Sequence, residues 1–480
     1  MVRGTAAFAA ASIVQRSVGF LLLPLYARIL TPAEYGEIGV ITGVTAALGT
    51  VLALGLETAI FRARIRYAAA PGEAHAFVNT VGGFALAVPI LVASVLSVVA
   101  VPGAAEAFGV GVDALRAALI GTALSVSATL VPLAVLRSQE RLGEYVRLTG
   151  IQVVLTTSLT LLLVAALRWG VTGWMLASAV SAALLLSRGL IVLNHRWSMT
   201  FERRHLREAL AFGLPLVPHA LSHWALSLSD RVVLGLFVDS AQIGHYYVAY
   251  QFGLPISVLA ISLSQGVQPL HAQAADSSER RIEIAQVSTH QALVIVFTAA
   301  VVGVVGPPAV LAALPIGYAG AAQFVPWIAL GVCLFGLYLI PVNAVTVMAG
   351  RTRWLWAISV TAALANLGLN LALVPRIGAL AAAVNTAIGY AILLAGVFLY
   401  MRRVCDPPIP YEWRRIGLGL ALIASASASA MIIAPREPLT AVVVRSAVML
   451  AVPILLVVTG VWRGLAQRTG RRVRHWMFRR

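Results

Sequence analysis

Ionisable side chains inside long apolar segments are the residues of this sequence best suited to do chemistry. Arg16 lies in the first such segment, Glu57 lies near the end of the second, and Asp230 and Arg231 are neighbours in the seventh. An Arg at the centre of a bilayer costs about 2.5–3.5 kcal/mol on insertion scales, so it usually faces a cavity or a partner. A guanidinium stays ionised and matches phosphate geometry. Arg16 therefore predicts either attraction of an anionic ligand or pairing with a carboxylate such as Glu57.

The seventh segment carries a polar stripe. His219, His223, Ser227 and Asp230 follow one another at intervals of three or four residues, which places them on one face of a helix. Such a stripe lines either water or another helix. Asp230 is a candidate for binding a coupling cation or a proton, and the adjacent Arg231 is a candidate for holding the ligand or for pairing across helices. His223 can titrate near neutral pH or form an interhelical hydrogen bond.

Composition indicates that membrane-spanning helices position these residues. The 480 residues are 60% hydrophobic and 11% charged, whereas soluble domains carry about 25% charged residues. Apolar runs of about 20 residues, the length that crosses a bilayer, recur from end to end. Only two Cys occur, which argues against a disulfide framework or a Cys-rich metal site.

Hydropathy and short Pro- and Gly-containing breaks predict fourteen transmembrane helices. They are expected at residues 8–30, 38–60, 77–101, 117–136, 148–167, 171–193, 210–237, 242–269, 290–314, 321–349, 354–374, 379–400, 416–434 and 440–462. The expected fold class is an all-α polytopic membrane protein.

The distribution of Arg predicts the orientation. All 35 basic residues are Arg, and with the N-terminus inside, 26 of them fall in cytoplasmic segments and 5 in or beside outer loops, counting Arg28 at the outer end of the first helix. Cytoplasmic loops are enriched in positive charge, so we expect both termini in the cytoplasm. The basic tail at 463–480 fits the same orientation signal, with binding to anionic lipid as the alternative. Nucleic acid is not an expected partner.

Two short segments indicate an internal repeat. The segment from Thr31 to Gly36 joins helices 1 and 2, and the segment from Asp239 to Gly244 joins helices 7 and 8 at an offset of 208 residues. Both lie in the first outer loop of a six-helix block, as a parallel repeat requires. The expected organisation is an N-lobe at 1–193, a cytoplasmic basic linker at 194–209, a C-lobe at 210–400, helices 13 and 14 within 401–462, and a basic cytoplasmic tail at 463–480.

Further polar and small residues lie within the predicted helices. Gly39 and Gly43 predict close helix packing. Four residues of the predicted fifth helix either face a lumen or bond to neighbouring helices: Gln152, Thr156, Thr157 and Thr160. The sequence contains no glycine-rich phosphate loop, HExxH motif or nucleophile elbow, and its outer loops are too short for a catalytic domain. It therefore predicts neither an enzyme nor a metal site.

Two regions resemble the polysaccharide-transport family of the multidrug/oligosaccharidyl-lipid/polysaccharide exporter superfamily. One is FLLLPLYARILTPAEYG, from Phe20 to Gly36; the other runs from Ser229 to Tyr250 and contains SDR, LG, IGHYY and AY. The resemblance implies a Wzx-type flippase of the bacterial inner membrane. Such a protein moves an undecaprenyl-diphosphate-linked oligosaccharide from the inner to the outer leaflet for cell-surface polysaccharide synthesis.

The resemblance also implies a mechanism and a site. In this superfamily two six-helix lobes exchange inward- and outward-facing states around a cavity, and related lipid II flippases hold the diphosphate with cavity Arg residues. The substrate-binding candidates are Arg16, Arg28, Arg231 and His223, and the ion-coupling candidates are Asp230 and Glu57. The sequence predicts no cofactor and allows coupling to H⁺ or Na⁺.

Other functions remain open at this point. A lipid II-type flippase or a multidrug exporter would share the fold, although the first lobe has only one deep Arg and the helices contain few acids. A membrane glycan polymerase or glycosyltransferase is the alternative from another class, and a scaffold without transport is a third. Besides the lipid-linked glycan, the expected partners are membrane lipids, a glycan polymerase and glycosyltransferases.

Overall fold

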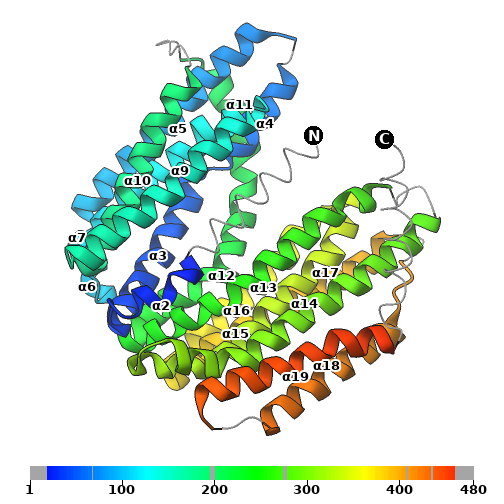
Figure 1. The fold of residues 1–480 in the computed structure, drawn as a ribbon. Helices are drawn as coiled ribbons and strands as arrows, with labels where there is room; N and C mark the ends of the chain where they lie inside the picture. Colours follow the sequence, from blue (N-terminus) through cyan, green and yellow to red (C-terminus); the bar gives the residue numbers. More distant parts are fainter. Residues whose placement is uncertain are drawn as a thin grey trace. The chain divides into compact units, whose positions relative to one another are not determined.

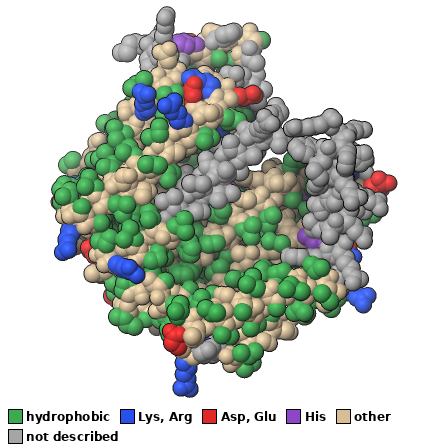
Figure 2. All heavy atoms as spheres, viewed as in Figure 1, with side chains coloured by type: hydrophobic (Ala, Val, Ile, Leu, Met, Phe, Trp, Pro, Cys, Tyr) green, Lys and Arg blue, Asp and Glu red, His purple; other side chains and the backbone are tan. Residues whose placement is uncertain are grey.

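The computed structural model describes residues 19–67, 69–194, 201–273, 278–406, 409–433 and 436–459. These residues form helices joined by short turns and contain no strand (Figure 1). Twelve helices in the described part are long and apolar enough to cross a membrane. Hydrophobic side chains spread over the visible surface, where charged side chains are sparse (Figure 2). The predicted all-α polytopic fold is confirmed.

The first of two compact units comprises the chain up to Tyr247 together with Ser359–Ala382. Its helices are α2 (Leu23–Tyr26), α3 (Pro32–Ala53), α4 (Leu56–Arg66), α5 (Pro71–Val99), α6 (Val101–Phe108), α7 (Val112–Ala128), α8 (Ala134–Ser138), α9 (Leu142–Thr160), α10 (Gly170–Leu193), α11 (Arg203–Gly213), α12 (Val217–Phe237), the start of α13 (Ser240–Gln273) and most of α16 (Leu355–Ile377). Single π-helical segments at Thr129–Leu133 and Leu161–Ala166 continue α7 and α9.

The second unit comprises Val248–Ile358 and Ala383–Arg480. Its described helices are the remainder of α13, α14 (Ser278–Ala313), α15 (Val325–Asn343), most of α17 (Ala379–Val404), α18 (Trp413–Ile433) and α19 (Pro438–Val458). Helix α14 packs against α15, α18 and α19. The last two helices of the chain therefore share a core with α14, in which Leu293 meets Val452 and Leu456.

The predicted second helix is two helices in the structure. Helix α3 begins at Pro32, earlier than predicted, because Thr31 and Glu34 form a capping box in which each side chain accepts from the other's backbone N–H. The chain then breaks at Leu54 and Gly55, whose φ angles are 48° and 67°. A Cβ on Gly55 would lie 2.5 Å from the carbonyl oxygen of Gly213, so this break is also a close backbone contact.

The predicted seventh helix is also divided. Residues 203–209, expected as part of a linker, form the first turns of α11, and a 3₁₀ turn at Leu214–Leu216 leads into α12. Helix α12 is not among the twelve apolar spans, since it carries the polar stripe. The predicted first helix, 8–30, lies mostly outside the described residues. The lobe and linker boundaries predicted from the sequence otherwise stay predictions.

The two segments of the internal repeat contact each other reciprocally. A Cβ on Gly36 would lie 1.9 Å from the carbonyl oxygen of Ser240, and a Cβ on Gly244 would lie 1.8 Å from the carbonyl oxygen of Pro32. The two contacts are related by the offset of 208 residues found in the sequence. No side chain fits at either glycine, so the contact depends on both.

The same register extends to the sixth helix of each block. A Cβ on Gly170, the first residue of α10, would lie 2.8 Å from Oε1 of Glu34. A Cβ on Gly378, which directly precedes α17, would lie 2.7 Å from Oε1 of Gln242. Both glycines have positive φ angles, 52° and 76°. Because Gly378 follows Gly170 by 208 residues and Gln242 follows Glu34 by the same offset, these contacts support a parallel repeat.

Candidate functional site

Asp230 and Arg231 form a buried pair of opposite charges on α12, with exposed fractions of 1% and 6%. The Asp230 carboxylate accepts hydrogen bonds from the Tyr246 hydroxyl and, at 2.8 Å, from the backbone N–H of Arg231. The Arg231 guanidinium carbon lies 4.9 Å from the centre of the Tyr247 ring, within the range of a cation–π contact. Two adjacent tyrosines of α13 thus contact the two charges.

Close packing of α12 against α3 positions this pair. The indole N–H of Trp224 donates to the carbonyl oxygen of Gly43 at 3.0 Å. A Cβ on Gly43 would lie 3.1 Å from a methyl group of Val232, and one on Gly39 would lie 3.3 Å from the Tyr247 side chain. The close packing predicted from these two glycines is confirmed. Small residues on α3 let the charged part of α12 approach its backbone.

The other substrate candidates are more exposed or lie outside the described chain. His223 is exposed on α12, where the Ser227 hydroxyl donates to its carbonyl oxygen at 2.7 Å. Arg28 is exposed in the turns that follow α2. Arg16 lies outside the described residues. Among the described candidates, Asp230 and Arg231 are the two that are buried, and the ligand roles of all these residues stay predictions.

Glu57, at the start of α4, forms an ion pair with Arg137 of α8. The carboxylate and guanidinium are 2.8 Å apart, and the two side chains are 39% and 35% exposed. The sequence predicts no such pair, because Arg137 fits a cytoplasmic loop and the partners lie on helices distant in sequence. The sequence gives one signal for Arg137: like Glu57, it lies at the end of an apolar run, and so near the membrane.

Glu57 also lines a polar cavity in the first unit. This cavity has a volume of about 360 Å³, which lies within the range of about 300–1,000 Å³ for small-molecule sites. Its wall is formed by residues of α3, α4, α7 and α10. Its hydroxyl-bearing side chains are Thr42, Thr45, Thr122, Ser125, Thr129 and Ser178. A lining of this kind is suited to holding water.

A second cavity of about 320 Å³ shares part of this wall. Ser125, Trp174 and Ser178 line both cavities. The second cavity is also lined by the polar residues of α9: Gln152, Thr156, Thr157 and Thr160. Of the two interpretations open for these four residues, the structure favours a lumen.

Chemically, the two cavities offer hydroxyl and amide groups together with one ion pair. Such groups can solvate a proton or a small cation, and no cluster of His, Cys, Asp and Glu that could hold a metal occurs in the described part of the chain. The first unit therefore contains two features able to carry charge: the buried Asp230–Arg231 pair, and Glu57 with Arg137 beside the cavities.

The chain is similar to known membrane transporters. Residues 1–274 match the family model described as polysaccharide biosynthesis protein. The structure of the lipid II flippase MurJ in an inward closed conformation is similar with a TM-score of 0.72 and 14% identity, covering 94% of this chain and 98% of that one. An inward-facing multidrug resistance transporter of the MATE family has a TM-score of 0.61 and 14% identity, covering 86% and 96%.

A third solved structure is similar at a lower level. It is a MOP superfamily transporter from Pyrococcus furiosus, with a TM-score of 0.51 and 13% identity, covering 83% of this chain and 95% of that one. No curated protein matches the sequence. The identities are low, so the structural likenesses show the fold, while the family match covers more than half of the chain. The chain therefore belongs to the family described as polysaccharide biosynthesis protein, and its fold is similar to that of these polytopic transporters.

Proposed function

We propose that this protein is a flippase that moves an undecaprenyl-diphosphate-linked oligosaccharide from the inner to the outer leaflet for the synthesis of a cell-surface polysaccharide. The observation that carries the proposal is the family match over residues 1–274, joined to a fold similar to that of a lipid II flippase over 94% of the chain. The one points to polysaccharide synthesis and the other to transport of a lipid-linked sugar.

The membrane and the orientation are part of the proposal. The protein resides in the bacterial inner membrane with both termini in the cytoplasm, which the concentration of Arg in the predicted inner segments supports. The glycosyltransferases that build the lipid-linked glycan and the polymerase that consumes it are its proposed functional partners, on opposite sides of the bilayer.

Alternating access is the proposed mechanism. The oligosaccharide crosses within the protein while the polyprenyl chain stays in lipid, and inward- and outward-facing states differ by only a few kcal/mol. Arg16 and Arg231 are the first candidates to hold the diphosphate, with Arg28 and His223 as further candidates. Asp230 and Glu57 are the candidates for coupling to H⁺ or Na⁺, because Asp230 is a carboxylate buried in α12 and Glu57 is a carboxylate paired with the Arg137 guanidinium. No cofactor takes part.

A second candidate substrate is lipid II. It is favoured by the TM-score of 0.72 to MurJ, against 0.61 to a MATE-family multidrug transporter. A multidrug exporter is the next alternative, and a glycan polymerase or glycosyltransferase is the alternative from another class.

Deletion of the gene in its host distinguishes these functions. The proposed function predicts loss of the surface polysaccharide and accumulation of its complete lipid-linked repeat unit in the inner leaflet. A lipid II flippase would instead give a cell-wall defect with accumulated lipid II, and a multidrug exporter would give drug sensitivity alone. A polymerase would leave the repeat unit in the outer leaflet, and unchanged surface polysaccharide would contradict the proposal.

A further inference from the structure

A small basic cavity lies between α4 and α11, apart from the residues assigned to transport. Its volume is about 270 Å³, slightly below the range of about 300–1,000 Å³ that is usual for whole small molecules. The charged residues of its lining are Arg62, Arg66 and Glu208. The rest of the lining is apolar: Ala59, Ala63, Phe77, Ala209, Ala211 and Phe212. The cavity thus has three charged side chains on one part of its wall, and its remaining lining, called the apolar floor below, is hydrophobic.

Arg62 is the residue of this cavity whose positive charge can bind an anionic ligand. Its guanidinium carbon lies 4.6 Å from the centre of the Phe212 ring, so a cation–π contact holds it at the cavity wall. No carboxylate forms an ion pair with Arg62 among the residues that the structure describes. Stacking on the ring leaves the N–H groups at the edge of the guanidinium plane, where they can donate to an anion.

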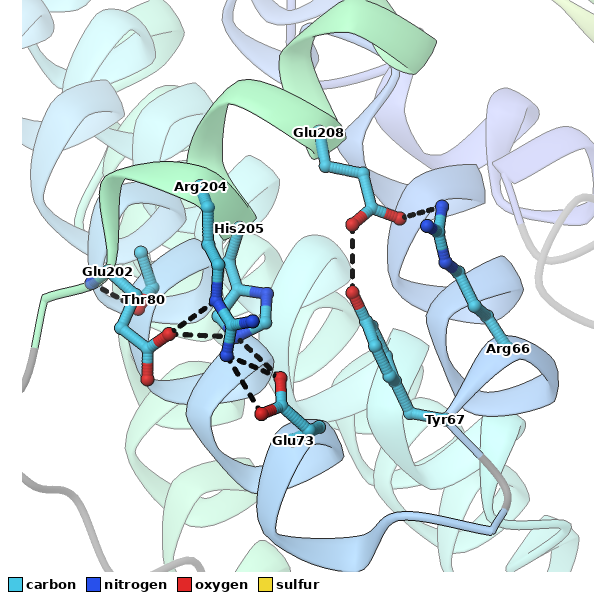
Figure 3. A network of polar contacts seen from close by, with 8 residues as sticks. All are labelled: Arg66, Tyr67, Glu73, Thr80, Glu202, Arg204, His205 and Glu208. Carbon is cyan, nitrogen blue, oxygen red and sulfur yellow. Dashed lines mark hydrogen bonds and ion pairs between the residues drawn. The ribbon is translucent and has the colours of Figure 1, made fainter.

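The other two charges of the cavity balance each other. The Arg66 guanidinium donates to one oxygen of Glu208 at 2.6 Å, and the Tyr67 hydroxyl donates to the other at 2.8 Å (Figure 3). Burial and the neighbouring Glu208 raise the pKa of Tyr67, so its hydroxyl stays a neutral donor. Both oxygens of the acid are engaged, and the cavity keeps one net positive charge, that of Arg62.

A second cluster fixes α11, and with it the wall of the cavity. The Arg204 guanidinium bridges Glu202 and Glu73 at 2.8 and 2.6 Å (Figure 3). The ring of His205 is buried beside Phe77. The hydrogen bonds to Glu73 and Glu202 raise the pKa of Arg204 above its usual value. This anchor therefore stays charged at every physiological pH and ties the start of α11 to α5.

The cavity also lies at the right depth for a headgroup. Arg62 is next to the last residue of the apolar span Pro32–Ala63, and Glu73 is the second residue of the span that starts at Gly72. The ends of membrane spans meet the layer of lipid headgroups. Charge orients these ends toward the cytoplasm, where anionic lipids attract basic groups.

We infer that this cavity binds the phosphate headgroup of a lipid. Arg62 donates to the phosphate oxygens, the apolar floor contacts the adjoining carbon atoms, and the lipid chains remain in the bilayer. The shared chemistry is a phosphate ester on a lipid, which either an anionic phospholipid or a polyprenyl diphosphate supplies. Arg62 and Arg66 are not among the residues assigned to transport, so the inference does not depend on the proposed function.

Binding to the full-length protein in phosphatidylcholine nanodiscs tests the inference. The probes are phosphatidylglycerol, undecaprenyl diphosphate and inorganic phosphate, each titrated separately. Arg62→Gln removes the donor of a charge-assisted bond and should weaken lipid binding about tenfold or more. The matched control is Arg207→Gln, which removes the same charge from an exposed site on α11 that does not line the cavity. It should change the affinity by less than about twofold.

Each possible result of these titrations either supports or overturns the inference that the cavity binds a lipid phosphate. Selective loss in Arg62→Gln supports the inference, and the lipid that binds more tightly to the unmodified protein identifies the source of the phosphate. Equal loss in both variants would mean attraction by general surface charge and would overturn it, as would inorganic phosphate binding as tightly as the lipids. If Arg62→Gln lowers the thermal unfolding midpoint without lipid, Phe212→Leu, which removes only the stacking ring, is used instead with the same expected loss.

Discussion

At the scale of single residues, the buried charges of α12 require their tyrosine partners. Tyr246→Phe removes one donor from a carboxylate that is 1% exposed, which should cost about 1–3 kcal/mol of unfolding free energy. The measurement is the unfolding midpoint of the purified protein in detergent. In an Asp230→Ala background, which removes the acceptor, Tyr246→Phe should be nearly neutral, because the two residues share one interaction. Additive losses would contradict this pairing.

Glu57 offers a test of ion coupling. Its pair with Arg137 is more than a third exposed at the carboxylate, so Glu57→Gln should change stability by less than about 1 kcal/mol. If Glu57 carries the coupling ion, transport by this variant should no longer respond to an imposed H⁺ or Na⁺ gradient. The control is Glu144→Gln, which breaks the similarly exposed pair with Arg141 and does not line either polar cavity. An unchanged gradient response in Glu57→Gln would remove Glu57 from this role.

Single residues also show where prediction from the sequence ends. Asp230 and Arg231 stand out because ionised groups are rare in apolar helices, and the structure finds both buried with specific contacts. Arg137 and Tyr246 give no comparable signal. An Arg at a helix end fits a cytoplasmic loop, and a Tyr in a membrane helix is commonplace, so their roles become visible only when distant segments are brought together.

At the scale of the elements, the reciprocal contact between the two repeats depends on glycine. Gly36→Ala and Gly244→Ala would each place a Cβ within 2 Å of a carbonyl oxygen, so each should destabilise the protein by about 1–3 kcal/mol. The control is Gly83→Ala in α5, where a Cβ meets nothing within 4 Å and the change should be neutral or stabilising by up to about 1 kcal/mol. Thermal unfolding compares the three. Equal midpoints would contradict the close contact.

Elements were predictable where hydropathy decides them. Long apolar runs predict most of the spans because each must fill the bilayer, and the offset of 208 residues predicts the repeat. The break at Leu54 and Gly55 was not predictable, since it depends on the approach of Gly213. Helix α11 was missed because its pattern of three Arg among eleven residues resembles a basic linker. Its helical structure depends on contacts with α4 and α5.

At the scale of the whole molecule, the orientation in the membrane can be tested with single cysteines. The native Cys333 and Cys405 are buried, so they give little background. Glu106→Cys and Arg207→Cys place exposed thiols in a predicted outer and a predicted inner segment. A membrane-impermeant maleimide should label Glu106→Cys in intact spheroplasts and Arg207→Cys only after permeabilisation. The opposite labelling would reverse the orientation.

The most direct test of the account is translocation by the purified protein. Proteoliposomes are prepared with a fluorescent undecaprenyl-diphosphate-linked oligosaccharide, and the fraction that a glycosidase on the far side can cleave is followed with time. The protein should increase the rate of appearance of that fraction well above that in protein-free vesicles, and Arg16→Ala should lower this rate at equal protein incorporation. A rate equal to that of empty vesicles, at several lipid compositions, would contradict the claim that this protein is a flippase.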